Sequence, residues 1–445
     1  MQLPQLTTMV AMKIRLDHLA DLHPEERARL LKRSQTDIAA VTQQIRPIVD
    51  DVRARGDAAL REHTLRFDKA DLGDLPIEVD DEERRQAPTL LSEEIRSALE
   101  YAVENVRRFH RSQRKAESEM TTVRPGIIAG ERSTSIESAG LYVPRGRGTF
   151  PSMLYMLAIP ATIAGVGRVA VATPPGQDGA VDPACLYAAD LCGVHHVYRV
   201  GGVQAIAALA YGTESVQPVR KIVGPGSAYV AAAKSIVSDR VDTGLPAGPT
   251  ESILLADQSA DPRIVALDLA IEAEHGRDSA ALLVTDSEEL AKKVKAILPD
   301  IVERAPEPRR EFLTEVFANY GGILVAGSMA EALAFVNEYA PEHIKIQTAD
   351  PWETLQEVRN AGEILLGDHS AFSLANYAVG ANAVLPTGGT AHTWSPVSVQ
   401  DFLKRSSVVY VSRQGYRSMK DHVLALADHE GFYMHAQSLR ARNEV

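Results

Sequence analysis

The middle of the chain alternates short apolar runs with helical segments, and this alternation constrains the fold more than any other feature. From Ser138 onward each run ends in Gly or Pro before a helix-like segment, as in AGLYVPRGRGTFPS, RVAVATPPG, HVYRVGGVQAIAALAYG and KIVGPGSAYVAAAKSIV. A second series follows in ESILLAD, SAALLVTD, GGILVAG and EILLGD. Strands that alternate with helices form parallel sheets covered by those helices. The pattern predicts an α/β protein with two α/β lobes.

Both ends of the chain have the spacing of helices. Ile38, Val41 and Ile45 recur at helical intervals, Pro47 can open a further helix, and Gly56 can end it. The segment SEEIRSALEYAVENVRRFHRSQ predicts an amphipathic helix with a solvated charged face. Near the C-terminus, SVQDFLKRSSV and RSMKDHVLALADHEG also indicate helices.

Charge and composition exclude several classes of protein. The 445 residues carry a net charge of −12, which argues against a nucleic-acid-binding surface. No apolar run approaches membrane-spanning length, and the N-terminal MQLPQLTTMVAMKIRLDHL lacks the apolar core of a secretion signal. Cys185 and Cys192, seven residues apart in a predicted helix, are expected to be core residues. We expect a cytoplasmic protein that binds a small ligand and neither nucleic acid nor membrane.

Two glycine-containing loops could bind a dinucleotide. Gly201 and Gly202 precede VQAIAALA, and the loop 224–227 (GPGS) precedes AYVAAAKSIV, so both place bare backbone amides at helix N-termini. Neither loop matches GxGxxG with an acidic residue at the expected distance. Tight strand-to-helix turns also need glycine, so the loops alone leave both interpretations open.

The segment NEYAPEHIKIQ presents two adjacent titratable side chains. Pro341 fixes the backbone just before Glu342 and His343, at the entry to an apolar run that predicts a strand. A neighbouring carboxylate and imidazole can move protons near neutral pH. On its own this segment favours a surface Glu-His pair, so other segments must decide.

A second segment, DLAIEAEHGRDS, contains candidate metal ligands. Glu272 and His275 are three residues apart and share a face if the segment is helical, with Glu274 adjoining. Zinc takes nitrogen and oxygen ligands of this kind, although many surface helices contain E-x-x-H without a metal. His435 is a further candidate but lies far away in sequence.

Ten ordered blocks resemble the histidinol dehydrogenase family over nearly the whole chain. They are GLYVPRGRGTFPS, RVGGVQAIAALAYGTESV, KIVGPGSAYVAAAK, LPAGPTES, EAEHGRDS, YAPEHI, LGDHS, NAVLPTGG, DFLKR and EGFYMHAQSLR. The resemblance implies a zinc-containing, NAD-linked enzyme that oxidises an alcohol, in the family's best-known case through an aldehyde to a carboxylate. It also implies two incomplete Rossmann-like lobes, with helical N- and C-terminal extensions exchanged in a homodimer.

The resemblance assigns roles to individual residues. Glu342 would activate the water that attacks the aldehyde, and His343 would take the alcohol proton. Zinc would be bound by His275 and by His435 of the partner subunit, and would orient the substrate and favour alkoxide formation. The remaining assignments place Tyr142, Gln204 and Ser227 at NAD, and Thr250, Tyr377 and Glu430 around the substrate.

The resemblance also predicts how the lobes divide the chain. Residues 37–141 and 252–397 would form a larger discontinuous lobe, and residues 142–251 an inserted Rossmann-like lobe with the cofactor at the carboxyl ends of its strands. Residues 1–36 would be an N-terminal helical segment, and 398–445 a helical tail that reaches the partner.

Two departures from the family pattern concern the metal. Glu272 stands where the family has glutamine, and Asn376 stands where it has aspartate in a GDY motif. Together these changes exchange an amide and a carboxylate, so the number of ligands and their summed charge are unchanged. We therefore expect a retained zinc site of Glu272, His275, Asn376 and His435. The alternative is that both positions drifted after the metal was lost.

Further departures concern the substrate and the cofactor. Ala383 replaces the histidine of NHVLPT, Phe372 replaces the usual glutamate after LGDHS, and Arg145 interrupts the VPGG pattern. A site that loses a hydrogen-bonding partner changes its preference. We therefore favour a paralogue that oxidises another small polar alcohol, with histidinol itself as the alternative. A non-catalytic relative that binds a nucleotide or metabolite is the second alternative.

Overall fold

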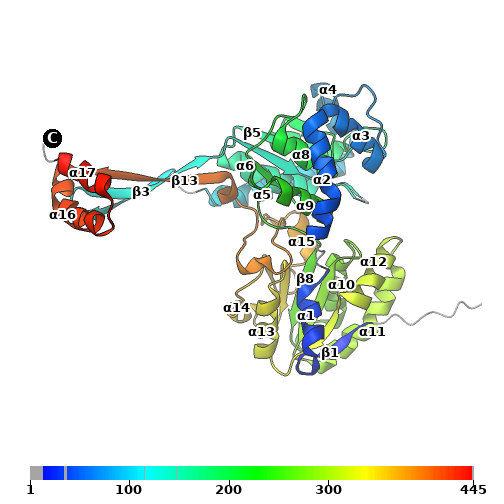
Figure 1. Cartoon of the computed structure of the whole chain (residues 1–445). Coiled ribbons are helices and arrows are strands. Elements are labelled where there is room, and N and C mark those ends of the chain that lie inside the picture. Colours follow the sequence, from blue (N-terminus) through cyan, green and yellow to red (C-terminus); the bar gives the residue numbers. More distant parts are fainter. Residues whose placement is uncertain (1–13, 35–37, 115, 147, 443–445) are drawn as a thin grey trace, which may run out of the picture.

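The computed structural model of the protein describes residues 14–34, 38–114, 116–146 and 148–442. These residues form a body of two lobes and a long arm that projects from it (Figure 1). Each lobe contains one parallel β-sheet, and the arm contains an antiparallel sheet. The parallel sheets confirm the predicted α/β class.

The first lobe contains a four-stranded parallel sheet with the strand order β6-β5-β4-β7. Its strands are β4 (Ser138–Tyr142), β5 (Arg168–Ala172), β6 (His196–Tyr198) and β7 (Lys221–Val223). Its connecting helices are α6 (Pro151–Ala164), α7 (Pro183–Leu191), α8 (Gly202–Tyr211) and α9 (Ala228–Val237). The strand order reverses between β4 and β7, and open α/β sheets bind ligands outside the carboxyl ends of strands at such a point.

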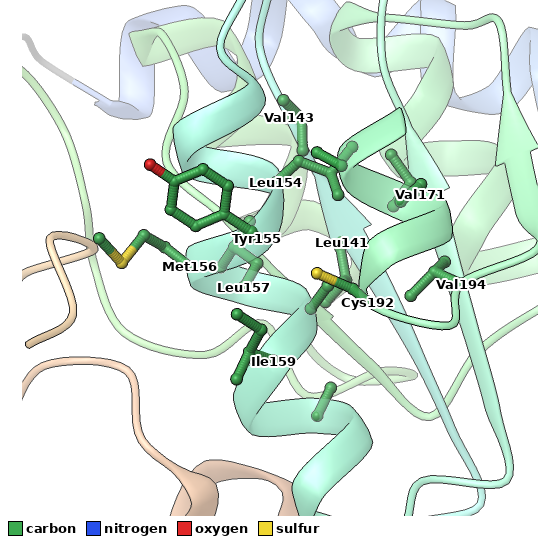
Figure 2. Packing of buried hydrophobic residues seen from close by; sticks show 14 of the residues in the cluster. Leu141, Val143, Leu154, Tyr155, Met156, Leu157, Ile159, Val171, Cys192 and Val194 are labelled. Atoms are coloured by element: carbon green, nitrogen blue, oxygen red, sulfur yellow. The ribbon is translucent and has the colours of Figure 1, made fainter. Parts of the chain in front are cut away.

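Helix α6 fills the centre of this lobe because it is apolar all round. Figure 2 shows Leu154, Leu157 and Ile159 of α6 packed near Leu141 of the sheet and Cys192. Both cysteines are free and buried, which confirms that they belong to the core.

Helices that precede the sheet in sequence also cover this lobe. They are α2 (Ile38–Arg55), α3 (Asp57–Asp68), α4 (Asp81–Gln86) and α5 (Glu93–Ser112), with a 3-10 turn η2 (Ala87–Leu90). Helix α2 packs on α8 and α9, and α5 packs on α6. The resemblance places residues 37–141 in one lobe with residues 252–397, whereas these helices lie against the four-stranded sheet. An apolar helix face shows that a helix is covered, but not which sheet covers it.

Two of the helix predictions can be compared directly with these bounds. The amphipathic helix is confirmed as α5, whereas Pro47 lies inside α2 instead of opening a new helix. Proline removes one backbone hydrogen bond, and buried Ile45 and Val49 on either side of it keep α2 packed against the lobe.

The second lobe contains a six-stranded parallel sheet with the order β1-β10-β9-β8-β11-β12. Its strands are β1 (Leu16–His18), β8 (Glu251–Ala256), β9 (Ala280–Thr285), β10 (Gly322–Val325), β11 (His343–Gln347) and β12 (Glu363–Leu366). Its helices are α1 (Pro24–Lys32), α10 (Pro262–Ala273), α11 (Glu288–Arg304), α12 (Arg309–Asn319), α13 (Met329–Tyr339), α14 (Pro351–Leu355) and α15 (Phe372–Tyr377). Short 3-10 turns are η1 (Leu19–Asp21) and η3 (Thr390–His392). Except for β1, these strands match the predicted apolar runs.

The arm combines the antiparallel strands β2 (Ser118–Arg124), β3 (Ile127–Ser135) and β13 (Leu403–Val411) with α16 (Arg413–His429) and α17 (Tyr433–Ala441). The helix predicted in SVQDFLKRSSV is wrong: a 3-10 turn η4 (Val399–Phe402) leads into β13. The run SSVVYV favours a strand, and β13 pairs with β3 along its whole length. Within the described residues, no helix has the length and apolar character needed to cross a membrane.

Candidate active site

Glu342 and His343 lie at the amino end of β11, as the turn in NEYAPEHIKIQ predicts. Ala340 has a φ of 49°, so the chain leaves α13 through a left-handed residue and Pro341 before the strand begins. In the sheet register, His343 lies beside Ser252 of β8 and Glu363 of β12. The pair therefore has a fixed place at one edge of the six-stranded sheet.

Both side chains are buried, with 6% and 3% of Glu342 and His343 exposed. His343 Nδ1 lies 2.9 Å from Glu363 Oε2, and His343 Nε2 lies 3.8 Å from Glu342 Oε1. The backbone N–H of Glu251 donates to Glu342 Oε2 at 3.0 Å. A surface ion pair is thus excluded for Glu342 and His343.

This environment shifts the pKa of both groups. Burial raises the pKa of Glu342 well above its usual range, and Glu272 adds to that rise despite the opposing effect of His343. Burial opposes the charged form of His343, but the carboxylates of Glu272, Glu342 and Glu363 together raise its pKa. The two groups can therefore hold and exchange a proton out of contact with bulk water.

The pair lines a cavity of about 790 Å³ between the two lobes. One wall consists of the loops that follow β4 and β7, including Pro144 and Ser227. The opposite wall is the amino edge of the six-stranded sheet. The cavity therefore lies between the carboxyl edge of one sheet and the pair Glu342 and His343 at the amino edge of the other.

Three of the four predicted metal ligands come together at this cavity. Glu272 is 1% exposed, and its carboxylate lies 3.2 Å from His275 Nδ1 and accepts a hydrogen bond from Asn376 Nδ2 at 2.8 Å. Helix α10 ends at Ala273, so His275 lies just beyond the predicted helix. Carboxylate oxygen, imidazole nitrogen and amide oxygen are donors that zinc accepts, so these residues fit the ion.

The fourth predicted ligand lies elsewhere. His435 is on α17, and Figure 1 shows α17 at the far end of the arm, away from both lobes. Among the described residues, no three His, Cys, Asp or Glu side chains of one chain form a metal-binding group. A complete set would need His435 from a second copy.

The predicted cofactor residues are divided between the surface of the cavity and the interior of the lobe. Ser227 lines the cavity, in the loop where a Cβ on Gly224 would lie 2.0 Å from the Tyr142 carbonyl oxygen. Tyr142 and Gln204 are buried and lie outside the cavity lining; the Tyr142 hydroxyl accepts the N–H of Gly202 at 3.1 Å. The close approach of the two backbones accounts for glycine at position 224.

Two of the three predicted substrate residues lie at the cavity, and the third lies on the arm. Thr250 and Tyr377 line the cavity, and the Tyr155 hydroxyl donates to the Tyr377 carbonyl oxygen at 2.6 Å. Glu430 ends α16 on the arm, near His435 in sequence. Of the departures from the family pattern, Ala383 lines the cavity, and Phe372 is fully buried with its ring centroid 5.7 Å from that of His343.

Two buried carboxylates at the site are absent from the sequence-based prediction. Glu363 orients the His343 ring, and Glu251 contacts Glu342 through its backbone N–H. Each is the first residue of a strand that pairs with β11. Each residue is a titratable side chain at the start of an apolar run, which is a signal that the sequence contains. The runs do not show which residues of neighbouring strands pair, so the sequence cannot place these carboxylates beside Glu342 and His343.

The family model for histidinol dehydrogenase matches residues 31–443. The chain belongs to the histidinol dehydrogenase family. A histidinol dehydrogenase of Synechocystis is 45% identical, over 97% of this chain and 99% of that relative. A histidinol dehydrogenase homolog 2 of Mesorhizobium japonicum is 46% identical, over 95% of this chain and 96% of that relative.

A solved structure supports the same assignment. The crystal structure of a histidinol dehydrogenase from Elizabethkingia anophelis matches with a TM-score of 0.89 at 32% identity, covering 97% of this chain and 98% of that one. The family comprises NAD-dependent oxidoreductases that act on a CH–OH group. The resemblance carried by the ten sequence blocks is therefore confirmed at the level of the family.

Proposed function

We propose that this protein is a zinc- and NAD-dependent dehydrogenase that oxidises L-histidinol. The observation that carries the proposal is the buried pair Glu342 and His343, which faces a cavity where Glu272, His275 and Asn376 converge. A binding module has no need of a buried proton-transfer pair. Relatives named histidinol dehydrogenase match almost the full length of the chain and favour histidinol over our first expectation of another alcohol. A cytoplasmic location is part of the proposal.

The geometry assigns each residue a task. Glu363 engages His343 Nδ1, which leaves Nε2 to hold the hydroxyl proton of the substrate. Glu342 lies beside Nε2 and can relay that proton or activate water in a second oxidation. Glu272, His275, Asn376 and a partner's His435 would hold zinc, and the loop 224–227 would hold NAD. When bound, NAD accepts hydride and zinc favours the alkoxide.

A second candidate substrate is a different small polar alcohol. Ala383, Val384 and Leu385 give one part of the cavity an apolar lining, and Ala383 cannot form the hydrogen bond expected of a histidine there. A site without that donor discriminates differently among alcohols. The placement of Phe372 against His343 changes the same neighbourhood.

NADH formation tests the proposal. Purified protein with zinc and NAD is given L-histidinol and, separately, a panel of amino alcohols, diols and hydroxy acids, and NADH absorbance is followed. We expect the highest kcat/KM with histidinol, and two NADH per alcohol if oxidation continues to the carboxylate. A higher kcat/KM with a panel member would favour the second candidate. No turnover with any compound, with zinc bound, would contradict the proposal and favour a non-catalytic relative.

Zinc content provides an independent test of the ligand assignment. Protein purified without added metal is expected to contain about one zinc per chain and to lose activity with a chelator, because Glu272, His275, Asn376 and a partner's His435 would supply four donors. Well under one equivalent, together with activity indifferent to chelator, would show that Glu272 and Asn376 do not maintain a zinc site.

A further inference from the structure

The side chain of Arg33, in the N-terminal part of the chain, is buried behind the active site. Arg33 follows the last residue of α1, and its side chain is 5% exposed. Arg33 Nε lies 2.6 Å from Glu251 Oε2, and its guanidinium lies 3.7 Å from the ring centroid of Tyr339. A buried arginine with a carboxylate and an aromatic partner is held in one orientation.

The same guanidinium binds the turn that carries Glu342. Arg33 Nη2 donates to the carbonyl oxygens of Tyr339 and Ala340, the second at 3.5 Å. Ala340 has the unfavourable φ of 49°, which persists only where surrounding contacts enforce it. Arg33 supplies such contacts, one residue before Pro341 and two before Glu342.

Glu251 connects Arg33 to Glu342 by a second route. Its carboxylate pairs with Arg33, while its backbone N–H donates to Glu342 Oε2. Without Arg33, the buried carboxylate of Glu251 would lose the cation paired with it. Arg33 also approaches the segment NAVLPTGG, because a Cβ on Gly389 would lie 3.1 Å from Arg33 Nη1.

We infer that Arg33 is a positioning residue for Glu342, acting through the carbonyls of Tyr339 and Ala340 and through the carboxylate of Glu251. Arg33 lies outside the cavity lining and touches no reacting group. Its effect is therefore on the position of the Glu342 carboxylate. The inference rests on the proposed function, since it gives Arg33 a part in the turnover that Glu342 supports.

Arg33→Gly is the sharpest test. Arg33 has a φ of 56°, which glycine adopts readily, so the substitution removes the side chain and leaves the backbone conformation available. Arg27→Met is the matched control. Arg27 is also on α1, where it pairs with Glu338 and lies over the Phe335 ring. Both of these partners are on α13, away from the site. Arg33→Lys keeps the charge beside Glu251 and loses the forked contact with the two carbonyls.

Two measurements are made on wild type and all three variants. Amide hydrogen exchange of segments 250–252 and 339–343 reports the turn without any need for turnover. We expect faster exchange there in Arg33→Gly and Arg33→Lys, and wild-type exchange in Arg27→Met. With the best alcohol, kcat should fall about a hundredfold in Arg33→Gly and about tenfold in Arg33→Lys, with KM for NAD unchanged. Guanidinium ion added to Arg33→Gly should restore part of kcat.

The outcomes separate the two proposals. Wild-type exchange at 339–343 in Arg33→Gly, or equal losses of kcat in Arg33→Gly and Arg27→Met, would overturn the role of Arg33. If Arg33→Gly does not fold, the same comparison between Arg33→Lys and Arg27→Met decides. If the wild-type protein oxidises no alcohol, the proposed function fails, while exchange still shows whether Arg33 holds the turn.

Discussion

Glu342 is the residue on which the proposed chemistry depends most directly. Glu342→Gln keeps the size of the side chain and an acceptor for the Glu251 N–H, but it removes the titratable group. We expect kcat to fall by about 10² to 10⁴, the usual contribution of a general acid or base. Steady-state kinetics measures this, and NADH binding by fluorescence should be unchanged. A kcat within about twofold of wild type would rule out a proton-transfer role for Glu342.

Glu251 makes the stability of the fold depend on pH. Burial raises the pKa of Glu251 to about 7, although Arg33 and the backbone amides of Gly388 and Glu342 favour its ionised form. Its unfolded pKa is 4.5, so between these values the folded state binds more protons than the unfolded state. The free energy of unfolding should therefore fall as pH rises through this window, by up to about 3 kcal/mol.

Glu251→Gln is expected to remove this part of the pH dependence. Denaturant unfolding at about pH 5 and about pH 8 should show a smaller difference in the variant than in wild type. The control is Glu131→Gln, which alters an exposed carboxylate paired with Arg405 on the arm and should leave the difference unchanged. Equal pH dependence in wild type and Glu251→Gln would contradict the effect assigned to Glu251.

At the scale of elements, a buried ion pair connects β11 to α10 behind the site. Lys345 is fully buried, and its Nζ lies 2.5 Å from Asp268 Oδ2 and donates to the Asp368 carbonyl oxygen at 3.1 Å. Lys345→Met leaves Asp268 buried without its cation, which should reduce the free energy of unfolding by about 3 to 5 kcal/mol. The double variant Lys345→Met/Asp268→Leu should recover much of that loss, because no uncompensated charge remains.

Urea denaturation of the single and double variants measures this coupling. Lys292→Met is the control, since Lys292 pairs with Glu288 on the exposed surface of α11 and should change stability by well under about 1 kcal/mol. A double variant no more stable than Lys345→Met would show that the loss comes from packing and not from the unpaired carboxylate.

The sequence predicts the strands of both lobes except β1, because buried parallel strands are continuous apolar runs. ESILLAD and SAALLVTD became β8 and β9, and neither run needed tertiary information. Strand β13 is mispredicted as a helix although its second half, SSVVYV, favours a strand, because its partner is the distant strand β3. Local propensity could not reveal that partner.

The residues of the candidate site also differ in whether a single segment reveals them. Adjacency and a preceding proline single out Glu342 and His343 in the sequence, and the family resemblance decides their role. Glu363 is brought to His343 by strand register, and Arg33 is brought to the preceding turn by the packing of α1. Sequence patterns show side chains that act together within one segment. They do not show contacts made by residues hundreds of positions apart, such as those of Arg33 with Tyr339 and Ala340.

At the scale of the whole molecule, the arm has a surface that neither lobe of the same chain covers (Figure 1). Figure 1 shows α16 and α17 far from both lobes. The arm exposes large apolar side chains, among them Val409, Tyr410, Phe432, Tyr433 and Met434. Exposed apolar surface of this kind marks an interaction site. With His435 and Glu430 on the same arm, a homodimer that exchanges arms would both cover this surface and complete the proposed site.

Active-site complementation tests this exchange. In a dimer whose sites each combine Glu342 of one chain with His435 of the other, His435→Ala and Glu342→Gln homodimers have no intact site. A heterodimer of the two variants has one intact site, so random co-assembly at equal amounts should restore about a quarter of wild-type kcat per dimer. Co-expressed, differently tagged chains are assayed for NADH formation. Activity that stays at the level of the separate variants, with heterodimers present, would place His435 at the site of its own chain.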